Sequence, residues 1–368
     1  MQNAIKYNAL ILLTAAVAFS GCRKIFDVPE EKDYLSTKIA FTTKSFTPRL
    51  GRLNLQTGIF NADNSSFPMK FELINLHFGD GRDASDILTQ KETLVWTSEY
   101  TGKETSLAEI EAKRKLETHP VVEVRSSGDL IMWPTASSEF IKPADTISFP
   151  QDIRYFDVRV TNSGGSRVLK DLSILPQVEV PYEPSEDINR ITGKPNTTTP
   201  GGKVLKHNYP GSISNIYGES TNSLIEKGGT DPVQGLIYLY IRKVPGGSGN
   251  TLRFKFLDKD SAAINPVKFN LTRWSELVHG FNMKMTPEYV QYDVAYPIPL
   301  VQGIPTKYTN GGVTGSGNEA RVEFSYSRKG FGGLQIIATI GQSFRIYEKG
   351  DWEIVYHFKT VNPKFTND

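Results

Sequence analysis

The chain has 368 residues, which is enough for two domains of ordinary size. Its 42 basic and 40 acidic residues leave a formal net charge of +2, and no lysine and arginine cluster is interleaved with aromatic residues, so nucleic acid is not expected as a partner. Aromatic residues make up 11% of the chain, and 31 glycines and 21 prolines divide it into short segments. This composition predicts a mostly β protein.

The first residues have the order of a secretory signal. Lys6 supplies a positive charge, and residues 9–19 form an apolar run too short to span a bilayer. Residues 19–22, Phe-Ser-Gly-Cys, resemble the bacterial lipobox, which implies that residues 1–21 are removed and that Cys22 carries lipid. Such acyl chains hold a protein at a membrane without a transmembrane helix. The alternative is an ordinary cleaved signal followed by a chance cysteine.

Residues 22–37 are predicted to tether the body of the protein to the membrane. The stretch is polar, contains a proline, and has no second cysteine for a disulfide. In Bacteroidetes-type lipoproteins, acidic residues close behind the cysteine favour export to the cell exterior. Here two basic residues come first, and the acidic residues begin only at Asp27. We therefore expect an outer-membrane protein and leave the membrane face open.

Residues 38–182 are predicted to form an N-terminal Ig-like β-sandwich. Strand-like runs separated by turn residues recur at residues 69–76, 93–96, 121–124, 130–133, 155–160 and 168–175, and the last two form a closing hairpin. A short helix is expected to begin at Ser106, because Ser106 and Glu109 have the spacing of a capping box. This helix would be an insertion between strands.

Residues 183–202 are rich in proline, threonine and glycine, with few apolar residues, and are predicted to link the two domains. Residues 203–368 are predicted to form a C-terminal β-sandwich. Its first strands are expected at residues 235–243, 251–258 and 267–271. The alternating apolar residues of 322–358 predict a terminal antiparallel meander.

Motifs for metal binding, cofactor binding or catalysis are absent from the sequence. The five histidines are scattered singly, no zinc motif occurs, and we expect each histidine to be an ordinary surface or strand residue, with His357 on the solvent face. No Gly-x-Ser-x-Gly elbow is present, and the one cysteine is assigned to lipid. Residues 315–320 look like a dinucleotide motif but lead into a strand, so neither cofactor nor metal is predicted.

The sequence leaves two possible roles for aspartate residues undecided. Carboxylates that could act in glycoside hydrolysis or calcium binding are dispersed, and sequence cannot pair them; they are Asp80, Asp83, Asp86, Asp258 and Asp260. The triplets that begin at Asp145 and Asp260 resemble the short O-glycosylation acceptor of Bacteroidetes. Turn and loop roles are the more ordinary interpretation of all these residues.

Tryptophan and tyrosine supply the candidate ligand contacts, because a flat exposed ring stacks against a sugar. Trp352 alternates with apolar residues and is expected in the core. Trp274, at a predicted strand end, is the leading candidate together with Arg273. Weaker candidates are Trp133, Tyr289 and Tyr292.

The start of the chain also resembles a known kind of protein. The stretch GCRKIFDVPEEKDYLS, with Leu-Gly-Arg at 50–52, Phe-Asn-Ala-Asp-Asn-Ser at 60–65 and GDWEIVYHF near the end, is similar to an uncharacterised Bacteroidetes outer-membrane lipoprotein family. Such families often accompany starch-utilisation-type (SusC/SusD-like) importers, which pair a TonB-dependent barrel with a lipoprotein lid. The resemblance implies accessory nutrient capture and carries over no catalytic residues.

These observations predict a lipid-anchored binding or accessory protein that helps an importer capture glycan or another nutrient. One alternative is a structural or assembly lipoprotein that contacts protein only, since β proteins offer strand edges to partners. A further alternative is a glycoside hydrolase whose dispersed carboxylates meet in the fold. No catalytic motif favours the last of these.

Overall fold

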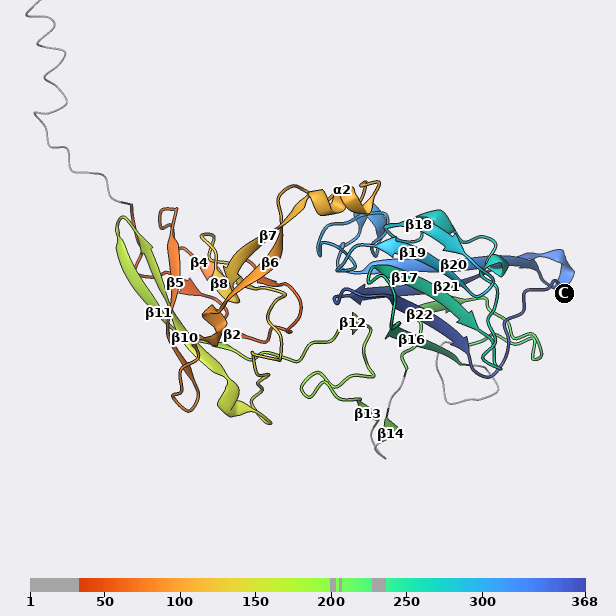
Figure 1. Ribbon diagram of the computed structural model, residues 1–368, viewed down its shortest axis with the longest axis horizontal. Coiled ribbons are helices and arrows are strands. Elements are labelled where there is room, and N and C mark those ends of the chain that lie inside the picture. The colour runs from red at the N-terminus through yellow and green to blue at the C-terminus, as the bar shows by residue number, and fades with distance from the viewer. Residues whose placement is uncertain (1–32, 199–202, 205–206, 227–235) are drawn as a thin grey trace, which may run out of the picture.

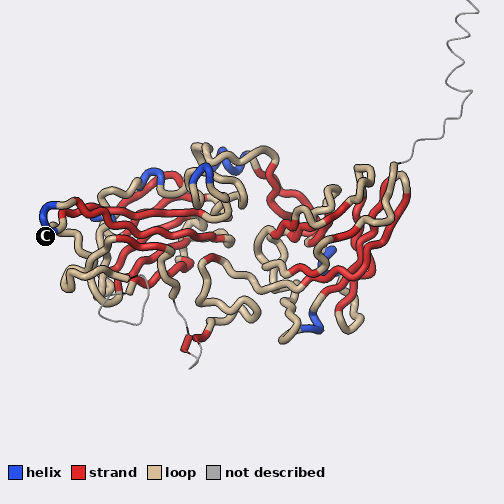
Figure 2. Tube along the Cα trace, turned by 180° about the vertical axis from the view of Figure 1, so that it is seen from behind, coloured by secondary structure: helices blue, strands red, loops and turns tan. Residues whose placement is uncertain are grey.

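The computed structural model describes residues 33–198, 203–204, 207–226 and 236–368. Cys22, the signal and most of the tether therefore lie outside the described residues. The protein is mostly β and built from several antiparallel sheets, which confirms the predicted fold class. Figure 1 shows an N-terminal body on one side and a C-terminal sandwich on the other, and Figure 2 shows from behind that strands dominate both.

The N-terminal body packs two main sheets against each other. The first has the order β2-β11-β10-β5 and the second the order β3-β9-β8. Their strands are β2 (Ser45–Phe46), β11 (Gly165–Ile174), β10 (Arg154–Asn162), β5 (Lys70–Phe78), β3 (Asn54–Gln56), β9 (Leu130–Met132) and β8 (Val122–Val124). Phe156, Val158 and Val160 alternate inward and pack with Leu130 and Met132 of the facing sheet. The predicted hairpin between β10 and β11 is confirmed.

Two smaller pairs complete this body. One consists of β1 (Ala40–Phe41) and β4 (Phe60–Asn61), and the other of β6 (Gln90–Trp96) and β7 (Arg114–Pro120). The helix α2 (Leu107–Ala112) joins β6 to β7, and the Ser106 hydroxyl accepts a hydrogen bond from the Glu109 N–H at 3.1 Å. The predicted helix and its cap are thus confirmed, while β7 was not predicted. Figure 1 shows α2 beside the C-terminal sandwich.

The C-terminal sandwich faces a five-stranded sheet with a second sheet built on one long strand. The first has the order β16-β22-β17-β19-β18, made of β16 (Ile237–Lys243), β22 (Trp352–Phe358), β17 (Thr251–Leu257), β19 (Tyr289–Val294) and β18 (Gly280–Met285). In the second, β21 (Gln335–Ile346) pairs with β12 (Tyr182–Glu183), β15 (Ser212–Ser214) and β20 (Ala320–Lys329). Phe254, Phe256, Phe324 and Tyr356 meet in the core between them.

The remaining elements are short. They are the strand pair β13 (Thr197–Thr198) and β14 (Lys203–Val204), and the 3-10 helices η1 (Ser85–Leu88), η2 (Pro150–Asp152), η3 (Pro266–Lys268), η4 (Trp274–Glu276), η5 (Gly312–Thr314) and η6 (Phe331–Gly333). No helix among the described residues has both the length and the apolar character needed to cross a bilayer.

The terminal meander is a correction, because it stops at β21. The strand β22 crosses to the five-stranded sheet, where it runs antiparallel to β16 and parallel to β17. Asp351 explains the crossing: its buried carboxylate accepts hydrogen bonds from the Gly249 N–H at 2.7 Å and from the Thr251 hydroxyl at 2.6 Å. These bonds fix the start of β22 beside β17 rather than beside β21.

Two local predictions are also corrected. Residues 267–271 do not form a strand, because the Asn265 side chain accepts from the Val267 N–H and Pro266 starts the helix η3 instead. Tyr182 was placed at the end of the N-terminal domain, yet it pairs with Ile346 and packs edge-on against Trp352 in the C-terminal core. The chain therefore enters the C-terminal sandwich before residue 183.

Candidate functional site: an interdomain cleft

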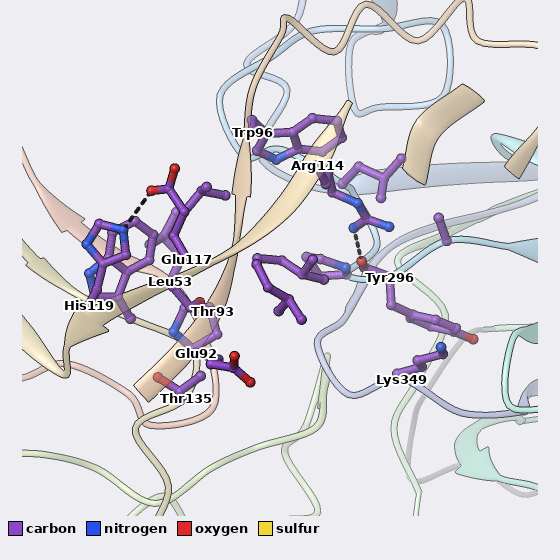
Figure 3. A pocket seen from close by; sticks show the side chains of 18 of the residues that line it. Leu53, Glu92, Thr93, Trp96, Arg114, Glu117, His119, Thr135, Tyr296 and Lys349 are labelled. Carbon is purple, nitrogen blue, oxygen red and sulfur yellow. Dashed lines mark hydrogen bonds and ion pairs between the residues drawn. The ribbon is translucent and has the colours of Figure 1, made fainter. Parts of the chain in front are cut away.

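A cleft of about 1190 Å³ lies between the two domains, slightly larger than most small-ligand sites. The β6–β7 ribbon lines much of it, and residues 294–297, Leu300, Tyr347 and Lys349 line the C-terminal side (Figure 3). We call this space the interdomain cleft. Its lining mixes aromatic, aliphatic and charged side chains.

The register of the ribbon decides which side chains share a face. Leu94 pairs with Leu116, and Trp96 pairs with Arg114, so these four side chains point to the same side. Leu94 is 49% exposed and Leu116 is 61% exposed, although both are large and apolar. Neither β6 nor β7 pairs with another strand within the described part of the chain. The ribbon thus offers a ligand both an apolar face and open backbone edges.

The far end of the ribbon is attached to the C-terminal sandwich. Arg114 donates from Nη1 to the carbonyl of Tyr296 at 2.7 Å, and its guanidinium lies 5.4 Å from the ring of Trp96. Below α2, Ile110 and Tyr100 pack with Ala295 and Leu300 in a small separate core. The ribbon is therefore held at both ends and is a fixed wall of the cleft.

A histidine held between two carboxylates lies at the N-terminal side of the cleft. His119 Nε2 is 3.0 Å from Glu117 Oε2, and Nδ1 is 3.1 Å from Glu123 Oε1 (Figure 3 shows the contact with Glu117). A neutral imidazole has one N–H, so both contacts are hydrogen bonds only in the protonated form. Hydrogen bonds from Lys115 and then His119 lower the pKa of Glu117.

Trp133 belongs to the same group. Its indole N–H donates to Glu123 at 3.0 Å, and its ring lies 4.6 Å from the ring of His119. The Arg125 guanidinium is 5.7 Å from the ring centre, and Arg125 forms no ion pair among the described residues. Trp133 is only 6% exposed, so it presents an edge to the cleft rather than an open ring face.

Arginines from both domains meet one carboxylate behind the cleft. Glu183 accepts from Arg49 at 3.0 Å and from Arg52 at 2.9 Å, both of the N-terminal body, and also from Arg345. The guanidinium of Arg52 lies 3.6 Å from the ring of Tyr347, which lines the cleft. Burial alone raises the pKa of Glu183, but Arg52 and Arg345 outweigh it and leave the pKa below its usual range. This network joins the two domains.

The predicted contact residues do not form one ligand surface. Trp274 is half-buried against Phe256 and Phe324, while Arg273 beside it is exposed. Tyr292 is a correction: it is 1% exposed and donates to the Trp274 carbonyl at 2.5 Å, so it braces the core. Tyr289, three residues away, alternates to the outer face of the five-stranded sheet. Of the five candidates, only Trp133 lines the interdomain cleft.

The histidines and acidic residues take mostly structural roles. His357 lies on the sheet face opposite core-facing Tyr356 and Phe358, as predicted, but its exposure is a correction: it is 6% exposed, with the ring of Tyr240 at 6.3 Å and Ser261 at 3.3 Å. Trp352 is in the core, as predicted. The dispersed carboxylates serve turns and ion pairs: Asp80 with Arg82, Asp83 with Ser85, Asp86 with Arg154, Asp258 with the N–H groups of Asp260 and Ala262, and Asp260 with Lys259.

The acidic residues that line the cleft all come from the first half of the chain. Those that line it, Glu92, Glu111, Glu117 and Glu123, come from β6, α2, β7 and β8, and the C-terminal lining residues include none. No cluster of three potential metal ligands occurs among the residues that the structure describes. The arrangement suits non-covalent binding through rings, leucines and charged groups of both signs.

Sequence reasoning found residues 93–96 of the first strand of the ribbon and missed its second strand, β7. His119 was treated as one of five scattered histidines, and no strand was predicted over residues 114–120. The available signal was the alternation of Arg114, Leu116 and Thr118 with Lys115, Glu117 and His119, which matches a strand. The signal was weak, because these seven residues include both basic and acidic side chains and only one large apolar one.

The chain was also compared with known proteins. No curated protein matches it in sequence. Residues 60–367 match the family described as Domain of unknown function (DUF5007), which covers both domains from β4 to the end of the chain. Because this match spans most of its length, the protein belongs to the DUF5007 family.

Proposed function

We propose that this protein is a lipid-anchored binding protein of the cell envelope, which captures glycan in the interdomain cleft beside a TonB-dependent importer. The observation that carries the proposal is the cleft itself, about 1190 Å³ in volume and bounded by both domains. The lipid anchor at Cys22 and the importer come from the sequence and its resemblance, and they are part of the proposal.

The lining of the cleft supports a polyhydroxylated ligand. Trp96 and Tyr347 are half-buried and supply ring surface, which suits the C–H faces of sugars, whereas Tyr296, like Trp133, is buried. Arg125 and Lys349 have no ion-pair partner among the described residues, so they are available to sugar hydroxyls. A ligand would enter between two walls that the Glu183 network and Arg114 hold at a fixed separation.

Affinity electrophoresis tests this proposal. The full chain, purified in detergent, is run through native gels that contain one soluble polysaccharide each, and retardation gives an apparent Kd. We expect retardation by at least one glycan, and we expect Arg125→Ala with Lys349→Ala to weaken it about fivefold or more. Lys103→Ala, an exposed residue outside the cleft, is the matched control. Failure of every glycan to retard the wild type would contradict the proposal.

The anchor and the partner need separate measurements. Labelled palmitate should enter the wild type and not Cys22→Ala, and only the wild type should stay in the membrane after a salt wash. Mild cross-linking in native membranes should then capture an importer barrel. Entry of palmitate into Cys22→Ala would remove the proposed anchor.

A second candidate function is favoured by one observation. Leu53, Leu94 and Leu116 are 44%, 49% and 61% exposed, and all three line the cleft. Exposed leucines beside open strand edges suit a protein segment better than a sugar. The protein would then be a structural or assembly lipoprotein that contacts protein only. Capture of a barrel that depends on these leucines, without affinity for any glycan, would favour this function.

A further inference from the structure

The outer face of the five-stranded sheet gathers tyrosines at positions that the core does not use. On β16, Ile237, Leu239 and Ile241 are buried, so Tyr238 and Tyr240 point outward. On β19, Val290 and Tyr292 are buried and Tyr289 points outward. We call Tyr209, Tyr238, Tyr240 and Tyr289 the tyrosine face.

Backbone pairing places these rings in a row across the sheet. Tyr240 pairs with Val355, Val355 with Lys255, and Lys255 with Tyr289, which is three strand spacings or about 14 Å. The bridge between Asn208 and Leu239 brings Tyr209 to the edge of β16. The rings of Tyr209 and Tyr238 lie 6.0 Å apart, and those of Tyr238 and Tyr240 lie 6.5 Å apart. A ligand that touches all of them must be extended.

The rings keep hydrogen-bonding capacity. The hydroxyls of Tyr238 and Tyr240 make no hydrogen bond within the described part of the chain, and both side chains are half-buried rather than covered. Tyr209 is 40% exposed, and it is the only large, strongly exposed apolar residue of this group. The face thus lacks the exposed aliphatic side chains of the interdomain cleft. A surface of tyrosines with no exposed leucine suits a ligand that has both C–H faces and hydroxyls, because tyrosine offers a ring and a hydroxyl together.

The tyrosine face carries more basic than acidic side chains. Lys255 lies at a register position between Tyr240 and Tyr289, and the neighbouring row across the sheet holds Arg242, Glu353 and Arg253. These are three cations and one carboxylate, or a net charge of +2. Glu353 binds Arg242 at 2.5 Å and lies 3.9 Å from Lys255. Arg253 donates to Gln291 at 2.6 Å and lies 5.0 Å from the ring of Tyr289, without a carboxylate partner among the described residues.

From this combination we infer that the tyrosine face is a second ligand surface, which binds an extended polysaccharide whose sugars carry carboxylates. The rings of Tyr209, Tyr240 and Tyr289 contact the sugar rings. The ring of Tyr238 is stacked on His207 at 3.6 Å, so Tyr238 contributes its hydroxyl. Arg253 pairs with a carboxylate in the geometry that guanidinium groups favour. The surface lies within one sheet and uses no residue of the interdomain cleft. The inference goes beyond the proposed function and stands or falls independently of the cleft.

The test is affinity electrophoresis of the full chain with polygalacturonate, with dextran as the neutral polymer and single-stranded oligothymidylate as a polyanion with stacking bases. We expect polygalacturonate to retard the wild type and dextran to leave its mobility unchanged. The variant Tyr238→Ala with Tyr240→Ala should bind polygalacturonate about tenfold more weakly. It keeps every charge, so its remaining retardation measures non-specific attraction of the polyanion.

Further variants guard against misfolding. Tyr240→Phe keeps the ring and should retain most of the affinity, while Arg253→Gln should weaken binding about fivefold and reduce its dependence on salt. Tyr34→Ala, a 58% exposed tyrosine of the N-terminal body, should change nothing. Thermal unfolding of each variant shows whether the sheet is intact.

Three outcomes would overturn the inference. They are equal retardation of the wild type and the folded double tyrosine variant, retardation by dextran alone, and retardation by oligothymidylate in place of polygalacturonate. The cleft variants Arg125→Ala and Lys349→Ala are run in the same gels. If only these two weaken the binding, the inference on the tyrosine face fails while the proposed function of the cleft stands.

Discussion

The interdomain cleft and the tyrosine face depend on different parts of the fold. The cleft has walls from two domains, joined by the Glu183 network, by Arg114 and by the small core below α2. The tyrosine face has positions on β16, β17, β19 and β22, which backbone hydrogen bonds fix within one sheet. A change in domain arrangement therefore alters the first surface and leaves the second intact. This difference gives experiments that separate them.

Loss of Glu183 is expected to have the largest effect. Glu183→Ala leaves Arg49, Arg52 and Arg345 partly buried without their shared carboxylate, so the free energy of unfolding should fall by about 3 to 5 kcal/mol. Urea unfolding measures this loss. In the folded variant, ligand binding in the cleft should weaken, whereas polygalacturonate binding at the tyrosine face should stay the same.

The matched control for Glu183 is Glu348. It also pairs with a cation, Lys243, but both side chains are about half exposed. Glu348→Ala should therefore cost less than about 1 kcal/mol. Equal losses for the two variants would show that the Glu183 network does not join the domains as described.

Acid should loosen the wall of the cleft that contains α2. Burial alone would raise the pKa of Glu104, but hydrogen bonds from Lys113 and Thr101 lower it to about 2. In the unfolded chain a glutamate has a pKa of about 4.3, so the ionised group stabilises the fold by about 3 kcal/mol. That contribution is complete above the unfolded value and is lost as the pH falls from about 4.3 toward 2.

Amide exchange of Leu107–Ala112 measures this loosening as a function of pH. Exchange should speed up as the pH falls through this window in the wild type, once the chemical rate is corrected for pH. Glu104→Gln lacks the titrating group, so its exchange should be faster at neutral pH and less dependent on pH. A wild-type profile that stays flat through the window would contradict the assignment.

The cap of α2 should have an intermediate effect. Ser106→Ala removes the acceptor for the Glu109 N–H, which costs about 1 kcal/mol. The loss should appear in urea unfolding and in faster exchange of the first turn of α2. Ser106→Asp supplies another cap acceptor and should restore stability. If alanine and aspartate behaved alike, the cap would contribute nothing.

The sequence predicts the elements whose residues alternate strongly. Residues 155–160 and 251–258 alternate apolar with polar or charged side chains, and both are strands close to the predicted bounds. Ser106 and Glu109 likewise predict the start of α2. Local spacing is sufficient in these cases because each element carries its own pattern.

Pairing between distant segments does not follow from such local patterns. The apolar run in β22 suits either sheet, and its position beside β17 depends on the bonds from Asp351 to Gly249 and Thr251, which are about a hundred residues away. His357 is buried for the same reason, because a central strand has neighbours on both sides. The sequence identified Trp133 as a candidate contact residue. It did not predict the cleft that Trp133 lines, because that cleft is formed by the β6–β7 ribbon and the second domain.

The leucines of the ribbon give the smallest effect on stability and the sharpest choice between the two candidate functions. Leu94 and Leu116 are half or more exposed, so Leu94→Ser with Leu116→Ser should change the free energy of unfolding by less than about 0.5 kcal/mol per site. If the cleft docks a protein, cross-linking to the importer should fall sharply, because the pair forms the apolar face of the ribbon. If it binds glycan through rings and charges, retardation in glycan gels should change about twofold at most.

Leu334→Ser is the control, since Leu334 is 73% exposed and lies outside the cleft. An equal response of partner capture to both sets of variants would mean that exposed leucines act non-specifically, and it would remove the one observation that favours the protein-only function.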